Sequence, residues 1–307
     1  MTTPVGAANP WAMEKLVPLI SGARTGPLGM AHLPRFWLKM RAYSVGILED
    51  GYRHGNGGSD ENLLTTFGID GDAFADFIQN DAPDYLTCEA WVRANAADAK
   101  PETIRKFTET LTTFEMPDPR RTEWTARFGL TGGTFTLAVG FNQLDDWDLV
   151  HHQLRAKDAP KTPLVPAIST AVAGPLGALH LPRLWIKRRV QAAGRLPAGY
   201  RVGAPGFDGA VAQVLGFDYD ALAAYIDAEL PDYLATEAWV RSNATSLTPE
   251  TIAALNARIL ATKLPEQYAP AMRARLGVDE SFERSIPLND LDDWLTLHEQ
   301  LKALAPV

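Results

Sequence analysis

One stretch of the chain occurs twice, and this duplication constrains the fold more than any other feature. GPLGMAHLPRFWLKMRA occupies residues 26–42, and GPLGALHLPRLWIKRRV occupies residues 174–190, 148 positions later. Each copy contains a tight Gly-Pro turn, a histidine, and a proline at the start of an expected helix, where its missing N–H costs no hydrogen bond. We therefore expect two homologous domains, which a length of 307 residues also favours.

Other segments repeat as well and predict helices. LVPLIS returns as LVPAIS, APDYLTCEAWVRAN as LPDYLATEAWVRSN, and LDDW closes both copies. Apolar residues spaced i, i+3, i+4 in these regions are typical of helices. We expect the LDDW aspartates to cap a final helix in each copy. The predicted fold is mainly α, with two homologous helical domains in tandem related by a pseudo-twofold axis, although residues 134–140 (TFTLAVG) could form a short strand.

The repeat also sets the expected domain boundaries. An N-terminal arm covers residues 1–13, the first repeat 14–156, a proline-rich linker 157–163 and the second repeat 164–307. Such a short linker holds the domains close together. A cleft between two packed domains is then the default place for a ligand.

Composition excludes several classes of function. The net charge of −8 opposes sequence-independent nucleic-acid binding, which needs clustered positive charge. A single cysteine, Cys88, allows neither an intrachain disulfide nor a cysteine metal cage. Nucleotide-binding glycine motifs, a signal sequence and a membrane-length apolar run are absent from the sequence. We expect a cytoplasmic protein without cofactor, metal, nucleic-acid or membrane partner, and the oligomeric state stays open.

The duplicated helix carries basic residues that could hold an anion. Arginine offers a planar fork and lysine a point charge to a carboxylate or phosphate, and a histidine beside a helix start can lie near free backbone N–H groups. The alternative is that these groups pair internally with Asp84, Glu89, Asp145 or Asp146. The candidate ligand-binding residues are Arg35, Lys39, Arg41, Tyr52, His180, Arg183 and Lys187.

Differences between the copies suggest where chemistry could occur. His54 and the glycine-rich loop at 55–58 exist only in the first repeat. One hypothesis is that His54 acts with His32 as a general acid or base, oriented by Asp84 or Glu89. The candidate catalytic residues are therefore His32, His54, Asp84 and Glu89. The competing interpretation of His54 is an exposed loop histidine.

The order G-x-L-G…H-L-P-R…K-x-R-A…G…Y…GID…D…E-x-W-V in residues 26–92 resembles the bacterial DUF5069 family, a domain of unknown function about one repeat long. Residues 174–240 resemble it too. The family typically has an acidic residue before the helix lysine, where this chain has Leu38 and Ile186. Its Cys-Pro-Leu-Asp connector becomes GGSD at 57–60 and PGFD at 205–208. The resemblance implies the fold and its repetition, and it carries no activity.

These patterns leave three functions open. The leading hypothesis is a cofactor-independent enzyme of the lyase, isomerase or hydrolase type, acting on a small anionic metabolite through histidine acid/base chemistry and an Arg/Lys anion site. The second is a non-catalytic small-ligand-binding or protein-interaction module built as a pseudo-dimer. The third is a structural pseudo-dimer whose charges are all paired internally. The sequence does not decide whether the protein is an enzyme, or whether one or both repeats are active.

Overall fold

The computed structural model describes residues 15–131, 133–156 and 162–304. Within these ranges the chain forms 14 α-helices, and its β-structure is restricted to isolated bridges. The prediction of a mainly α fold is therefore confirmed. The predicted N-terminal arm at 1–13 and residues 157–161 of the predicted linker lie outside the described residues, and the proposed domain boundaries stay predictions.

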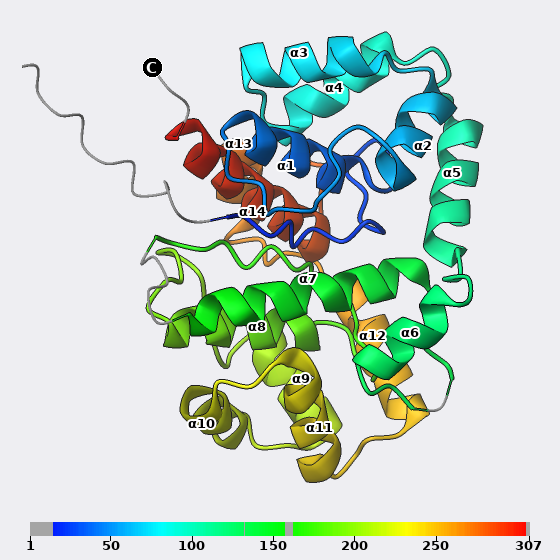
Figure 1. The fold of residues 1–307 in the computed structure, drawn as a ribbon. Helices are drawn as coiled ribbons and strands as arrows, with labels where there is room; N and C mark the ends of the chain where they lie inside the picture. Colours follow the sequence, from blue (N-terminus) through cyan, green and yellow to red (C-terminus); the bar gives the residue numbers. More distant parts are fainter. Residues whose placement is uncertain (1–14, 132, 157–161, 305–307) are drawn as a thin grey trace, which may run out of the picture.

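Each repeat contains seven helices in the same order (Figure 1). The first repeat contains α1 (Leu33–Ser44), α2 (Gly58–Phe67), α3 (Gly71–Asp81), α4 (Tyr85–Asn95), α5 (Pro101–Thr113), α6 (Arg120–Arg127) and α7 (Ala138–Arg155). The second contains α8 (Leu181–Ala192), α9 (Phe207–Leu215), α10 (Tyr219–Glu229), α11 (Tyr233–Asn243), α12 (Pro249–Ala261), α13 (Ala269–Leu276) and α14 (Ser285–Lys302).

Local sequence explains where most helices begin. The carboxylate of Asp70 accepts hydrogen bonds from two backbone N–H groups in the first turn of α3, and that of Asp84 accepts one, from Thr87 N–H, in the first turn of α4. Helices α1 and α8 begin with Leu-Pro after a histidine, His32 or His180, whose backbone is left-handed with φ of 71° or 69°. These starts agree with the sequence prediction, because caps and first-turn prolines act over only a few residues.

The prediction for the last helix of each repeat is wrong at its start. Helix α7 begins at Ala138, so Asp145 and Asp146 lie inside it and cap nothing. The apolar pattern continues upstream of LDDW, where Phe141 is fully buried, and this burial extends the helix. Residues 134–140 form no strand; Leu137 makes a single isolated bridge to Glu115 before α7 starts.

Helices α7 and α14 lie between the two repeats and contact both. The ring of Trp147 on α7 packs against Tyr233 of the second repeat at 4.6 Å, and Trp294 on α14 packs against Tyr85 of the first repeat at 4.6 Å. Figure 1 shows α14 beside α1 and α7 beside α8. Such reciprocal contacts are expected of a pseudo-twofold arrangement, which itself stays a prediction.

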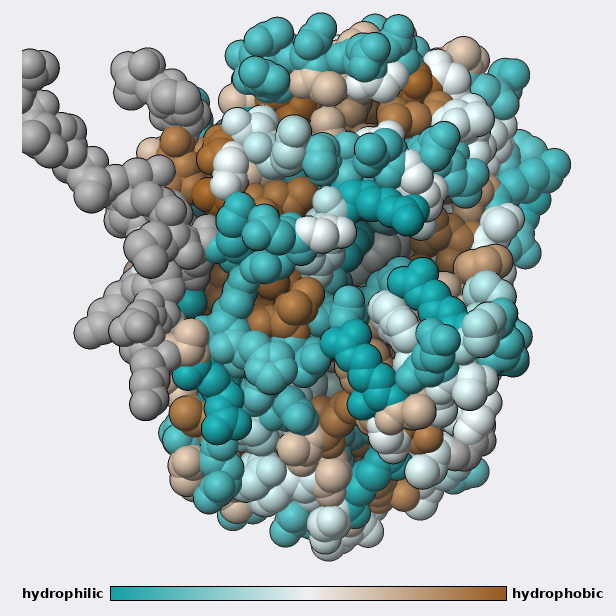
Figure 2. Space-filling model, viewed as in Figure 1, coloured by the Kyte–Doolittle hydropathy of each residue, from teal (hydrophilic) through white to brown (hydrophobic). Residues whose placement is uncertain are grey.

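The core runs through both repeats. Its largest fully buried side chains include Trp37 and Trp185, and Cys88 is a buried free thiol, as the sequence predicts for a small apolar residue. Hydrophilic residues cover much of the face shown in Figure 2, with apolar residues between them. No helix in the described part of the chain combines the length and apolar character that a membrane span needs.

Candidate functional site

The predicted anion-binding arginine of the first repeat is buried and already paired. Arg35 reaches Asp146 on α7 with its two terminal nitrogens, Nη1 to Oδ2 at 2.6 Å and Nη2 to Oδ1 at 3.0 Å. Its Nη1 also donates to the backbone carbonyls of Pro18 and Ile20. The Tyr52 hydroxyl donates to the same Asp146 carboxylate at 2.5 Å. Internal pairing with Asp146, one of the two alternatives for Arg35, is therefore what the structure shows.

Two further candidates converge on a carboxylate that the sequence analysis did not select. His32 Nε2 lies 2.7 Å from Asp60 Oδ1, and Lys39 Nζ lies 2.6 and 2.7 Å from its two oxygens. Asp60 is 1% exposed. The signal that could have identified it is its position: it ends the GGSD connector, and Asp208 ends PGFD at the same place in the second repeat.

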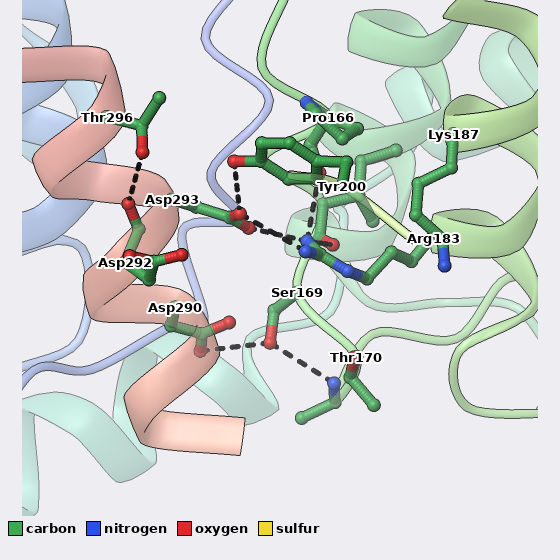
Figure 3. A network of polar contacts seen from close by, with 12 residues as sticks. Pro166, Ser169, Thr170, Arg183, Lys187, Tyr200, Asp290, Asp292, Asp293 and Thr296 are labelled. Atoms are coloured by element: carbon green, nitrogen blue, oxygen red, sulfur yellow. Dashed lines mark hydrogen bonds and ion pairs between the residues drawn. The ribbon is translucent and has the colours of Figure 1, made fainter. Parts of the chain in front are cut away.

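The second repeat contains the same two networks. Arg183 forms a bidentate pair with Asp293 on α14, and the Tyr200 hydroxyl donates to that carboxylate at 2.7 Å. Figure 3 shows the guanidinium and the tyrosine converging on Asp293. His180 and Lys187 both contact Asp208, each with a nitrogen 2.7 Å from Oδ1.

Burial sets the protonation of these networks. It lowers the pKa of His32 and of His180 to about 4, and the neighbouring Lys39 or Lys187 charge acts in the same direction. Burial opposes ionisation of Asp60, but hydrogen bonds from His32 and the Lys39 charge outweigh it and lower the pKa of that carboxyl to about 2. Both imidazoles are therefore neutral at pH 7 beside an ionised aspartate.

Arg41 also has a structural environment. It is 1% exposed, and its Nη1 reaches the Ser44 hydroxyl at 3.3 Å and the Ile78 carbonyl at 3.5 Å. Ile78 lies in the last turn of α3, where carbonyls carry partial negative charge. Arg41 therefore joins α1 to the C-terminal end of α3 within the first repeat.

The predicted proton-transfer set is not assembled. The His54 ring stacks on Tyr43 with centroids 3.6 Å apart, and Asp84 caps α4. Glu89 is buried beside Tyr85, and burial raises the pKa of its carboxyl. No hydrogen bond or ion pair within the described ranges joins His54, Asp84 or Glu89 to His32.

A pocket of about 710 Å³ lies within the second repeat rather than between the repeats. It is bounded by the connector at 198–210, the end of α12, α13 and α14, and His180, Arg183, Lys187 and Asp208 are among its lining residues. A smaller pocket of about 360 Å³ lies where Arg24 and Pro27 of the first repeat face Trp294 of the second.

Two arginines give the larger pocket an excess of positive charge. Arg201 and Arg258 are exposed lining residues, and neither forms an ion pair with an acidic residue in the described part of the chain. The Arg201 guanidinium lies over the Tyr268 ring, 5.0 Å from its centroid. Neither arginine is among the residues predicted from the sequence, although the copies differ at Arg258: the first repeat has Thr110 at the corresponding position.

The pocket contains no obvious metal centre. Among the residues that the structure describes, no group of three or more His, Cys, Asp or Glu side chains is placed to hold an ion.

Comparison with known proteins identifies a family without assigning an activity. No curated protein and no solved structure matches the chain. The family model DUF5069, described as a domain of unknown function, matches residues 23–133 and again residues 175–294. The two matches cover most of the chain: the first spans α1 to α6, and the second spans α8 to α13 and the first part of α14. The chain therefore belongs to the DUF5069 family and contains its domain twice in tandem.

Proposed function

We propose that the second repeat binds a small anionic molecule in the 710 Å³ pocket, with Arg201 and Arg258 neutralising its charge. The observation that carries this proposal is the presence of two exposed arginines, without acidic partners among the described residues, at the edge of a small-molecule-sized pocket. Pockets that bind small ligands typically measure about 300–1,000 Å³. This proposal keeps the expectation of an anion site, but assigns it to other residues and to the second repeat alone.

The energetics favour the exposed arginines over the buried ones as the anion-binding groups. To receive a ligand, Arg183 would have to leave Asp293, and removing one partner of a buried ion pair costs about 3–5 kcal/mol. Arg201 and Arg258 break no ion pair when they bind an anion. The buried Arg183 and Lys187 stay paired with Asp293 and Asp208.

The test is a thermal-shift titration with succinate and with inorganic phosphate at constant ionic strength. Stabilisation depends on ligand concentration relative to Kd, so binding should raise the melting temperature progressively. Losing one charge-assisted hydrogen bond costs about 1.5–3 kcal/mol, so Arg201→Gln and Arg258→Gln should each weaken binding by about 10- to 100-fold.

Arg53 provides the matched control, because it is the counterpart of Arg201 in the first repeat. Arg53→Gln should leave the titration unchanged. The proposal is wrong if neither anion shifts the melting temperature of the wild type, or if Arg53→Gln weakens binding as much as Arg201→Gln does.

A further inference from the structure

The second repeat contains a hydrogen-bond chain that is one member longer than its counterpart. The hydroxyl oxygen of Thr170 lies 3.0 Å from His180 Nδ1, and His180 Nε2 lies 2.7 Å from Asp208 Oδ1. In the first repeat Gly22 stands where Thr170 stands in the second. A Cβ added at Gly22 would lie 3.2 Å from His32 Nδ1, so this position faces the histidine ring in both repeats. The duplication therefore supplies a version of the same network without the hydroxyl.

The surroundings of Asp208 fix the direction of this chain. Its two oxygens accept from Lys187 Nζ and from the Gly203 backbone N–H as well as from His180. An ionised carboxylate surrounded by donors requires a proton on His180 Nε2. Because burial lowers the pKa of His180 to about 4, the ring is neutral and Nδ1 carries a lone pair. Thr170 is then the donor to His180, as a nucleophilic hydroxyl is to its base.

The three residues of this hydrogen-bond chain also border the 710 Å³ pocket. Thr170, His180 and Asp208 border it at 1–2% exposure, below the exposed Arg201 and Arg258. An anion bound by the arginines would add negative charge near the histidine. Such a charge raises the pKa of His180 from its depressed value and makes Nδ1 a better proton acceptor. Ligand binding and base strength are therefore linked in this arrangement.

We propose that Thr170 is a nucleophile for acyl transfer and that the second repeat hydrolyses esters or thioesters of small acids that carry a second anionic group. This inference rests on the proposed anion site. Thr170 supplies the attacking oxygen, His180 is the general base and acid, and Asp208 is a positioning residue that holds the imidazole tautomer.

The reaction balances without a cofactor. Thr170 Oγ1 bonds to the substrate carbonyl carbon, and its proton moves to His180 Nδ1. The bond from carbon to the alcohol or thiol breaks, and the leaving group takes that proton, which leaves an acyl ester on Thr170. A water molecule then attacks this ester and gives a proton to His180. Thr170 regains a proton as the carboxylic acid departs.

The probe is mono-p-nitrophenyl succinate, an activated ester with one free carboxylate. The wild type should release p-nitrophenolate faster than buffer, and mass spectrometry of digested, acid-quenched protein should find a succinyl group on Thr170. Removing the nucleophile with Thr170→Val should abolish the adduct and return p-nitrophenolate release to the rate in buffer, whereas Thr170→Ser should retain both the adduct and the faster rate. Thr66→Val, which removes a hydroxyl from α2 in the first repeat, should change neither.

The outcomes separate this inference from the proposed function. If succinate binds through Arg258 but no adduct forms on Thr170, acyl transfer is overturned and the anion site stands. If the adduct forms equally in Arg258→Gln, the anion site fails while Thr170 remains the nucleophile. An adduct on any other residue overturns the assignment to Thr170. The location of the adduct is measured in the wild type, so the test does not depend on any variant folding.

Discussion

The histidine that precedes α1 and α8 combines two costly features. Its backbone is left-handed, with φ of 71° in His32 and 69° in His180, a conformation that costs an L-residue about 1–2 kcal/mol. Its ring is buried and neutral beside an ionised aspartate. The left-handed turn places the ring against Asp60 or Asp208, and the strain therefore positions a polar group.

Acidification is expected to destabilise the fold through these two residues. His32 faces Asp60, Lys39 and Arg35, and His180 faces the equivalent groups. Because the folded pKa is about 4 and the unfolded value is 6.5, the unfolded state binds more protons between these limits. The contribution of each neutral histidine to the free energy of unfolding is fully present above pH 6.5. It falls by about 3 kcal/mol per histidine as the pH decreases to 4. Urea unfolding of the wild type and His180→Gln across this range measures the effect.

The variant should show a shallower loss of stability on acidification than the wild type. His152→Gln is the control, because that side chain is 71% exposed. An identical pH dependence in the wild type and His180→Gln would contradict the assignment of a neutral, buried imidazole.

At the scale of elements, one buried ion pair joins the first helix of each repeat to the last. Arg35 connects α1 to Asp146 on α7, and Arg183 connects α8 to Asp293 on α14. These pairs also hold Tyr52 and Tyr200. The mid-helix aspartates thus act as anchors for the connectors that follow α1 and α8.

Replacing one partner of such an ion pair should lower the free energy of unfolding more than replacing both partners. Arg35→Met leaves the Asp146 carboxylate buried without its cation and should lower the free energy of unfolding by about 3–5 kcal/mol. The double variant with Asp146→Leu should recover part of this loss, because it buries no unpaired charge. Urea unfolding compares the two. Arg105→Met, on a side chain 60% exposed, should cost less than about 1 kcal/mol, and a comparable loss there would refute a special role for the buried pair.

At the scale of the whole molecule, the repeats share an interface built from their last helices. Trp147 contacts Trp185 and Tyr233 across this interface, and Trp294 contacts Tyr85. Asp290 of α14 also binds Arg24 of the first repeat. In the first repeat the position of Asp290 is occupied by Gln143, which bonds to Ser21 within its own repeat. Each half therefore completes the core of the other, although the polar contacts differ.

A substitution that destabilises one repeat should therefore also destabilise helices of the other. Trp294→Ala removes a large buried side chain from the second repeat and should destabilise the protein by about 3–5 kcal/mol. Because Trp294 packs on Tyr85, amide hydrogen exchange should accelerate in α4 of the first repeat. Trp91→Ala is the control, since that ring packs on Phe74 and Phe77 within the first repeat and should leave α11 unchanged. If amide hydrogen exchange in Trp294→Ala accelerates only in the second repeat, the shared core is refuted.

The sequence predicts what depends on near neighbours and fails where distant residues meet. The duplication, the helical class and the caps at Asp70 and Asp84 follow from local patterns. Aspartates are frequent caps, so LDDW suggested a helix start, but Asp146 lies inside α7 and pairs with the buried guanidinium of Arg35, 111 residues away in the chain. The pocket in the second repeat could not be predicted, because it forms only where α12, α13 and α14 surround the connector.

The shared interface also has a consequence during synthesis on the ribosome. Arg24 and Asp290 are 266 residues apart in the chain. At about 5–20 residues per second, on the order of 10–50 s separate the synthesis of the two partners. Once residue 155 has been made, the first repeat has the sequence of all seven of its own helices, yet the face around Tyr85 has no α14 to cover it. The nascent protein thus exposes apolar surface around Tyr85 until α14 emerges and buries it.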